Sequence, residues 1–133
     1  MNKIVLLLLL LPFLLFSQEQ KKAKELVAAP STVEERRFVR NGNDLYEKKN
    51  FAKALPLLEY YVSNSKKVSK ENLYELSYCY YEAKQLNKAI EGFKQLSSEN
   101  DSLGQNSMYL LGDCYLRTGQ KANARIAFQF CAF

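Results

Sequence analysis

The stretch 111–115, which reads LGDCY, has the residue types of a reactive site more clearly than any other part of this 133-residue chain. It joins a glycine, the carboxylate of Asp113 and the thiol of Cys114, a combination compatible with a redox or a nucleotide site. A thiol is reactive as the thiolate, which needs a base or a positive charge beside it. The chain contains no His, which removes the Cys–His and Ser–His pairs of nucleophilic catalysis and most zinc geometries. The remaining Asp, Glu, Lys, Tyr and Cys residues form no recognisable motif, so we expect no enzyme activity, no cofactor and no metal site.

The same stretch belongs to a pattern that returns every 35 residues. Ala54, Ala89 and Ala124 are separated by 35 residues each time. The same shift aligns a small position (Gly42, Ser77, Gly112), a large position (Leu58, Phe93, Phe128), and the sets Leu45, Tyr80, Tyr115 and Phe38, Leu73, Met108. Within each unit the apolar residues follow i, i+3, i+4, i+7 spacing, which predicts amphipathic helices rather than strands. Two such helices per unit at this period are typical of a helical solenoid.

Local signals predict how these helices begin and pack. Ser31 with Glu34, and Ser102 with Gln105, have the spacing of a capping box at a helix start. The small position should let the two helices of a unit approach closely, and the large position should fill the space between neighbouring helix pairs. We therefore expect the glycine of LGDCY to be a packing residue.

At these positions the units resemble the tetratricopeptide repeat (TPR) family. The stretch MYLLGDCYLRTGQKANARIAF, residues 108–128, has the family's residues at Met108, Leu111, Gly112, Tyr115, Ala124 and Phe128. The second unit matches with Ser77 in place of Gly, whereas the first departs at Asn41 and carries Pro56 inside its second helix, and the third has Lys121 where an aromatic is usual. The resemblance implies an all-α fold, a right-handed TPR-like helical solenoid of three helix-turn-helix units, that binds a protein or peptide partner.

The start of the chain reads as a secretory signal peptide. Lys3 precedes an apolar run from Ile4 to Phe16, followed by Ser17. As a helix this run would span roughly 20 Å, short of a hydrocarbon core of about 30 Å, although an uncleaved short anchor is the alternative. We expect cleavage after Ser17 and a location in the periplasm or cell envelope, because exported TPR arrays of this kind resemble cell-envelope proteins of Gram-negative bacteria. The predicted organisation is a signal peptide (1–17), a polar linker (18–32) and a TPR-like repeat domain (33–133) with units at about 35–66, 70–101 and 105–133.

Charge gives no sign of a nucleic-acid partner. The formal net charge is +5, and loss of residues 1–17, which hold one Lys and no acid, leaves +4. A nucleic-acid footprint needs basic residues concentrated on one face, whereas here basic and acidic residues are interleaved and the densest cluster (Lys66, Lys67, Lys70) falls in an apparent loop. We interpret the charge as solubility and expect no nucleic-acid binding.

The cysteines are expected to be small buried residues. Cys79 and Cys114 are 35 residues apart, at a position where the TPR family typically has Ala, and Cys131 falls in the predicted second helix of the third unit. Cys is among the most buried residue types and often replaces a small apolar residue. Because the count of three is odd, one disulfide stays an open alternative.

Tyrosines supply the candidate binding surface. Tyr74, Tyr78 and Tyr81 form a helical stripe distinct from the core stripe of Leu76 and Tyr80, and in a TPR fold such positions line the concave groove. The predicted partner-binding groove consists of Asn43, Tyr46, Tyr74, Tyr78, Tyr81, Tyr109, Asp113 and Arg117. Tyr offers a large contact area with few rotamers to immobilise. The alternative is that some of these rings pack against neighbouring repeats instead.

The end of the chain suggests a wider context. FQFCAF, residues 128–133, closes the last predicted helix without a polar capping helix, which solenoids need. Ile126, Phe128, Phe130 and Phe133 would then meet water. We expect either further repeats in a longer protein or self-association through this apolar face. The alternative function is accordingly a structural assembly scaffold associated with envelope complexes.

Overall fold

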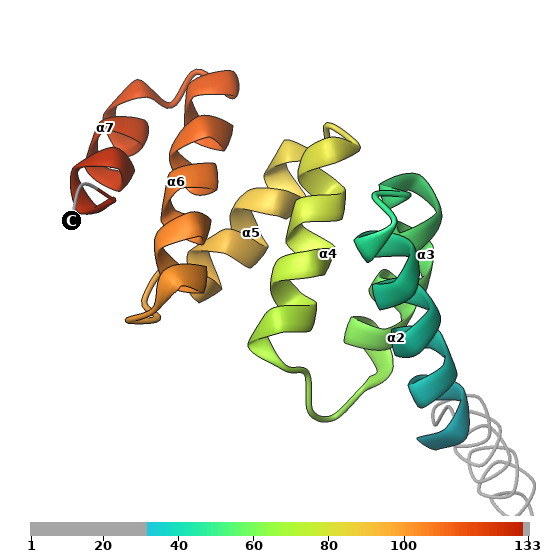
Figure 1. The fold of residues 1–133 in the computed structure, drawn as a ribbon. Helices are drawn as coiled ribbons and strands as arrows, with labels where there is room; N and C mark the ends of the chain where they lie inside the picture. Colours follow the sequence, from blue (N-terminus) through green and yellow to red (C-terminus); the bar gives the residue numbers. More distant parts are fainter. Residues whose placement is uncertain (1–31, 132–133) are drawn as a thin grey trace, which may run out of the picture. The chain divides into compact units, whose positions relative to one another are not determined.

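The computed structural model describes residues 32–131, which form six α-helices and no strand (Figure 1). Residues from Val33 onward make up one compact unit. The helices are α2 (Thr32–Glu47), α3 (Phe51–Asn64), α4 (Lys70–Glu82), α5 (Leu86–Leu96), α6 (Ser102–Arg117) and α7 (Lys121–Phe130). They confirm the predicted all-α, TPR-like helical solenoid of three helix-turn-helix units. The predicted signal peptide and nearly all of the linker lie outside the described residues, and none of the described helices has the length and apolar character needed to cross a membrane.

The turn between the two helices of a unit has one geometry in all three units. Its left-handed residue is Lys49, Lys84 or Gly119, with φ of 57°, 61° and 78°, and these positions are 35 residues apart. In each turn the next amide donates to the carbonyl five residues back, at 2.8, 2.9 and 2.8 Å. This is the Schellman pattern, which satisfies carbonyls at a helix end and favours Gly at the left-handed residue. Two units therefore hold a lysine in a conformation that suits glycine.

The small position brings the two helices of a unit together as expected. A Cβ atom added at Gly42 would lie 2.8 Å from Cδ2 of Leu58, and one added at Gly112 would lie 2.7 Å from Cε1 of Phe128. Both distances are too short for real carbon contacts, so the large side chain of the second helix rests directly on the backbone of the first. In the second unit the small position holds Ser77, whose side chain is only slightly larger than that of glycine, and the large side chain opposite, Phe93, is fully buried.

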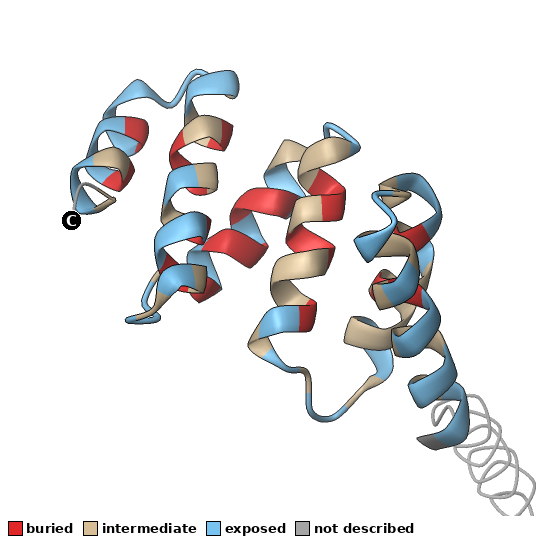
Figure 2. Cartoon of the chain, in the orientation of Figure 1, coloured by how far each residue is buried: buried red, intermediate tan, exposed pale blue. Residues whose placement is uncertain are grey.

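The core lies mainly on α4, α5 and α6, where Figure 2 shows most of the buried residues. Cys79 and Cys114 are both 0 % exposed and free. Burial raises the pKa of the Cys79 thiol to about 12 and that of Cys114 to about 11, so neither is a thiolate near neutral pH. The prediction that these two residues are buried is confirmed. Cys131 differs: it follows the last residue of α7 rather than lying inside the helix, and it is partly exposed.

One predicted helix start is wrong. The N-cap of α6 is Asp101, whose carboxylate accepts from the amide of Gly104 at 2.9 Å, and Ser102 is already the first helical residue. A carboxylate is the better acceptor for the unpaired amides and favourable dipole of a helix N-terminus, which moves the cap one residue ahead of the predicted box. Lys70, the first residue of α4, forms ion pairs with Asp101 and with Glu99. The other predicted capping box begins at Ser31, outside the described residues.

Candidate functional site

The predicted groove residues lie on the first helices of the three units, and four of its tyrosines form one aromatic cluster. We call Tyr46, Tyr74, Tyr78 and Tyr81 the tyrosine cluster. Tyr78 is its centre: its ring centroid is 6.3 Å from that of Tyr74, 5.8 Å from that of Tyr81 and 5.9 Å from that of Tyr46. Tyr74 and Tyr78 are nearly parallel, whereas Tyr46 meets Tyr78 edge-on at 82°. Such offset and edge-to-face arrangements are the favoured ones for aromatic rings, so the cluster joins α2 to α4 in a defined geometry.

Two phenylalanines pack against the tyrosine cluster. The ring centroid of Phe51, the first residue of α3, lies 5.4 Å from that of Tyr46 and 5.3 Å from that of Tyr78, and both contacts are edge-on. The buried Phe93 of α5 lies 5.9 Å from Tyr74. All four tyrosines are consequently half-buried. The alternative that these rings pack against neighbouring repeats therefore applies to them, and their part in a binding groove stays a prediction. The contact of Phe51 with these tyrosines was not predicted from the sequence, although an aromatic residue at the start of the second helix was a signal for it.

The phenol of Tyr81 connects α4 to α6 through a charged network. Its hydroxyl donates to Oδ2 of Asp113 at 2.7 Å. Arg117 forms an ion pair with the same oxygen, with Nε 2.8 Å away, and its guanidinium carbon lies 4.8 Å from the centroid of the Tyr81 ring. Burial and the hydrogen bond to Asp113 raise the pKa of Tyr81 to about 12, so the phenol stays a donor. Among the described residues no further partner is found for the terminal NH₂ groups of Arg117, which leaves them open to a ligand.

Three polar side chains, those of Asn43, Asn72 and Glu75, form a hydrogen-bonded group beside the tyrosine cluster. With its amide oriented to satisfy both ends, Asn43 accepts from Asn72 at 3.1 Å and donates to Oε2 of Glu75 at 2.9 Å. Burial, followed by the charges of Glu47 and Glu71, raises the pKa of Glu75. Burial also raises the pKa of Tyr46, with Tyr74 and Glu75 as smaller causes. Asn43 was predicted from the sequence to lie at this surface, whereas Asn72 and Glu75 were not. The signal for these two residues was that they form a polar pair on the inner side of α4.

Tyr109 stands apart from the other predicted residues. Its ring lies 5.8 Å from Phe128 of α7, and the side chain is 59 % exposed. No ring contact joins it to the tyrosine cluster among the described residues. The structure thus brings together the tyrosine cluster, Asp113 and Arg117, with Asn43 beside them, and leaves Tyr109 on a separate part of α6.

The tyrosine cluster and its neighbours present aromatic and hydrogen-bonding groups. Within residues 32–131 there is no group of three or more His, Cys, Asp or Glu residues able to hold a metal ion. The carboxylate of Asp113, which sequence analysis placed in the groove, is engaged by Tyr81 and Arg117. What the surface presents is aromatic edges, one partly satisfied guanidinium and nearby acids.

Comparison with known proteins bears on the fold and the family. Residues 47–131 match the family model described as anaphase-promoting complex, cyclosome, subunit 3, a TPR-type repeat family, over more than half of the chain. No curated protein and no solved structure gives a match.

Proposed function

The chain belongs to this TPR-type repeat family, and from that premise we propose that it is a protein-interaction module whose partner binds across the tyrosine cluster. Proteins of this family are generally non-catalytic interaction modules. The observation that carries the proposal is the link between the half-buried rings and the Tyr81–Asp113–Arg117 network. Ring packing and a salt bridge immobilise these side chains before any partner arrives, which lowers the entropic cost of binding.

The surface favours a partner segment with an apolar side chain and a hydrogen-bond acceptor. Aromatic edges of Tyr74 and Tyr78 suit an apolar or proline-containing contact, since tyrosine supplies a large, stiff contact area. The open NH₂ groups of Arg117 suit a backbone carbonyl or a carboxylate. An extended segment or an amphipathic helix can combine both features.

Photo-crosslinking in the source cell tests this proposal, because it captures the partner whatever its identity. A benzophenone amino acid at Glu82, next to the cluster, should give a defined protein adduct, and the same probe at the exposed Lys53 on α3 should not. Adding Arg117→Ala to the Glu82 probe should remove the adduct. Absence of an adduct at Glu82, or the same adduct from both positions, would reject the cluster as the binding surface.

We also propose that the protein acts in the periplasm or cell envelope, in association with envelope complexes. The support is the pattern of Lys3, the apolar run and Ser17. Sequencing the mature N-terminus tests it: a start at Gln18 in a periplasmic fraction is expected, whereas an intact Met1 in the cytoplasm would reject it.

The second candidate function is that of an assembly scaffold, which also contacts components through a surface other than the tyrosine cluster. The observation in its favour is that Ile126 and Phe130 of α7 are 51 % and 70 % exposed. Self-association through these residues is one of the two alternatives expected from the sequence, the other being further repeats in a longer protein. Sedimentation velocity decides it, because a dimer that Phe130→Gln dissociates would support self-association and a monomer at all concentrations would reject it.

A further inference from the structure

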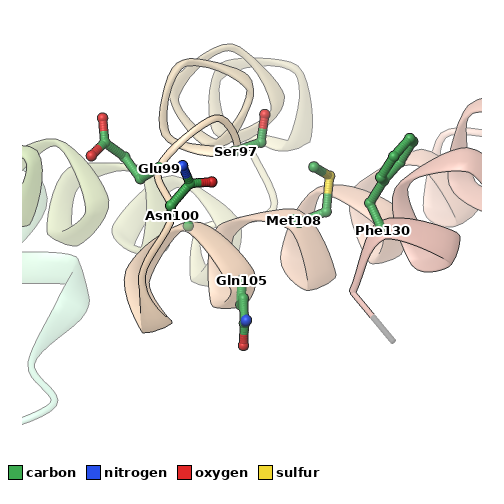
Figure 3. A pocket seen from close by; sticks show the side chains of 7 residues that line it. Ser97, Glu99, Asn100, Gln105, Met108 and Phe130 are labelled. Carbon is green, nitrogen blue, oxygen red and sulfur yellow. The ribbon is translucent and has the colours of Figure 1, made fainter. Parts of the chain in front are cut away.

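A groove between α5 and α7, floored by α6, lies outside the tyrosine cluster. We call it the α5–α7 groove. It is a cavity of about 300 Å³ whose walls and floor include Met108, Leu111, Tyr115, Ile126, Ala127 and Phe130. A second cavity of about 310 Å³ shares Met108 and Phe130 with it. Figure 3 shows these two side chains next to each other, projecting from α6 and α7 toward the same side. The two cavities therefore adjoin at these two apolar side chains, whereas the rest of the second cavity is lined mainly by polar residues such as Glu99 and Asn100.

The second unit contains the equivalent groove, which has a similar floor but different walls. That cavity, about 230 Å³, is floored by Leu73, Leu76 and Tyr80. A shift of 35 residues converts this floor into Met108, Leu111 and Tyr115, which is nearly the same surface. The walls differ in kind. Glu91 and Gln95 of the second unit become Ile126 and Phe130 in the third.

In the second unit the polar groups of the groove satisfy one another. Glu59 of α3 accepts from the hydroxyl of Tyr80 at 2.6 Å and from Nζ of Lys88 at 3.1 Å. Those two hydrogen bonds, with that of Tyr80 the larger cause, lower the pKa of Glu59. The groove of the second unit thus already holds a carboxylate of its own chain between a phenol and a cation.

In the third unit the matching carboxylate is missing. Position 94, which is 35 residues after Glu59, is a lysine, and Lys94 lines the α5–α7 groove together with Tyr115. The Nζ of Lys94 and the hydroxyl of Tyr115 have no hydrogen-bond or ion-pair partner among the described residues. Two donors therefore line a mainly apolar groove, and neither donates to Ser97 or Asn123, the other polar residues of its lining.

We propose that the α5–α7 groove docks a partner segment that carries a carboxylate flanked by apolar side chains. The carboxylate takes the place that Glu59 occupies one unit earlier and accepts from Lys94 and Tyr115. The apolar side chains cover Ile126, Phe130 and Met108, whose exposure to water is otherwise unfavourable. Charge complementarity selects an acidic segment over a basic one. Because this groove lies on the α5–α7 side and uses none of the tyrosine cluster, the proposal stands or falls independently of binding at that cluster. It competes with self-association, which would use Ile126 and Phe130 of the same groove.

The same charge argues against a second copy of this chain as the occupant. Two copies that met groove to groove would place two Lys94 ammonium groups in one interface, and no acidic residue among those described lines either groove to pair with them. An acidic segment of another protein meets no such repulsion.

Fluorescence anisotropy with designed peptides tests the proposal on the full chain. Three short fluorescein-labelled peptides serve as probes, one built from Glu and Leu, one from Lys and Leu, and one from Glu and Ser. Saturable binding is expected for the Glu/Leu peptide alone. Lys94→Glu, which copies Glu59 at the equivalent position one unit earlier, should weaken that binding about tenfold, a loss equivalent to roughly 1.4 kcal/mol.

Matched variants separate the groove from general effects of charge and apolar exposure. Lys121→Glu makes the same charge change at an exposed site of α7 outside the groove, and Leu116→Gln removes an apolar side chain that is 50 % exposed. Neither should change the affinity, whereas Ile126→Glu with Phe130→Gln should abolish binding; far-ultraviolet circular dichroism checks that each variant keeps its helices. The proposal is overturned if no peptide binds, if the Lys/Leu peptide binds as tightly, or if Lys121→Glu weakens binding as much as Lys94→Glu. A concentration-dependent dimer that Phe130→Gln dissociates would overturn it in favour of a second copy.

Discussion

The three equivalent turns allow a stability experiment inside one molecule. Lys49, Lys84 and Gly119 occupy the same left-handed position, with φ of 57°, 61° and 78°, and the same hydrogen bonds surround each of them. We predict that Lys49→Gly stabilises the protein and that Gly119→Lys destabilises it. Lys49 is the cleaner site, because the ammonium of Lys84 lies 5.8 Å from the Tyr81 ring centroid and its loss offsets part of the gain.

The magnitude follows from two opposing effects. A left-handed backbone costs an L-residue roughly 1–2 kcal/mol that glycine does not bear. Against this, glycine loses more conformational entropy on folding than lysine does, which favours the unfolded state by about 0.4–1 kcal/mol. The net expectation for Lys49→Gly is a gain of about 0.5–1 kcal/mol in the free energy of unfolding. For a domain of this size that corresponds to a rise in melting temperature of roughly 2–8 °C.

Urea unfolding followed by circular dichroism measures the change, with thermal unfolding as a second readout. Arg40→Gly in the exposed interior of α2 is the matched control, since glycine in an ordinary helical conformation should cost about 1 kcal/mol. Gly119→Lys should lower stability by about as much as Lys49→Gly raises it. The reasoning fails if Lys49→Gly lowers the stability as Arg40→Gly does, or if Gly119→Lys has no effect.

Three further predictions concern packing, a buried carboxyl group and the thiols. Gly112→Ala should destabilise by about 1–3 kcal/mol in urea unfolding, because the new Cβ would lie 2.7–2.9 Å from three ring atoms of Phe128; an unchanged midpoint would show that the ring moves freely. Burial raises the pKa of the Glu75 carboxyl group, so the folded state binds its proton more tightly than the unfolded state. Protonation of Glu75 therefore stabilises the fold at low pH, and this contribution is lost as the pH rises above 4.5, the ordinary pKa of a glutamate. Glu75→Gln should remove this loss, and parallel stability–pH curves for the two proteins would contradict the assignment. With a colorimetric disulfide reagent at pH 8, the native protein should expose one reactive thiol and the urea-unfolded protein three, since burial raises the pKa values of Cys79 and Cys114 to about 12 and about 11; rapid modification of all three in the native state would refute it.

Much of the architecture was predictable from the sequence because it depends on local periodicity. The 35-residue spacing of Ala54, Ala89 and Ala124 predicted two helices per unit, and the structure has them. The second helices begin at positions 51, 86 and 121, also 35 residues apart. A side chain's position on a helix face follows from its residue number alone. For this reason the burial of Cys79 and Cys114 and the close approach at the small position were also correctly anticipated.

Contacts between helices needed the tertiary structure. Tyr81 and Asp113 are 32 residues apart, and their hydrogen bond depends on how α4 and α6 meet. Both were predicted to face the groove, but nothing in the spacing showed that they would join each other. The contact of Phe51 with the tyrosine cluster likewise depends on tertiary structure, because it needs the start of α3 to lie beside Tyr46 of α2 and Tyr78 of α4.

The sequence by itself determined the repeat, the helices and the inward-facing residues of this protein, and it identified Gly112 of LGDCY as a packing residue. Tertiary structure alone decided which polar groups are satisfied. Only the structure shows that Glu59 pairs with Tyr80 and Lys88, and that the donors of Lys94 and Tyr115 have no partner within residues 32–131. The physical reason is range: helix formation and facing are set by neighbours a few residues away, whereas hydrogen bonds and ion pairs between helices depend on ångström-level distances between residues far apart in the chain.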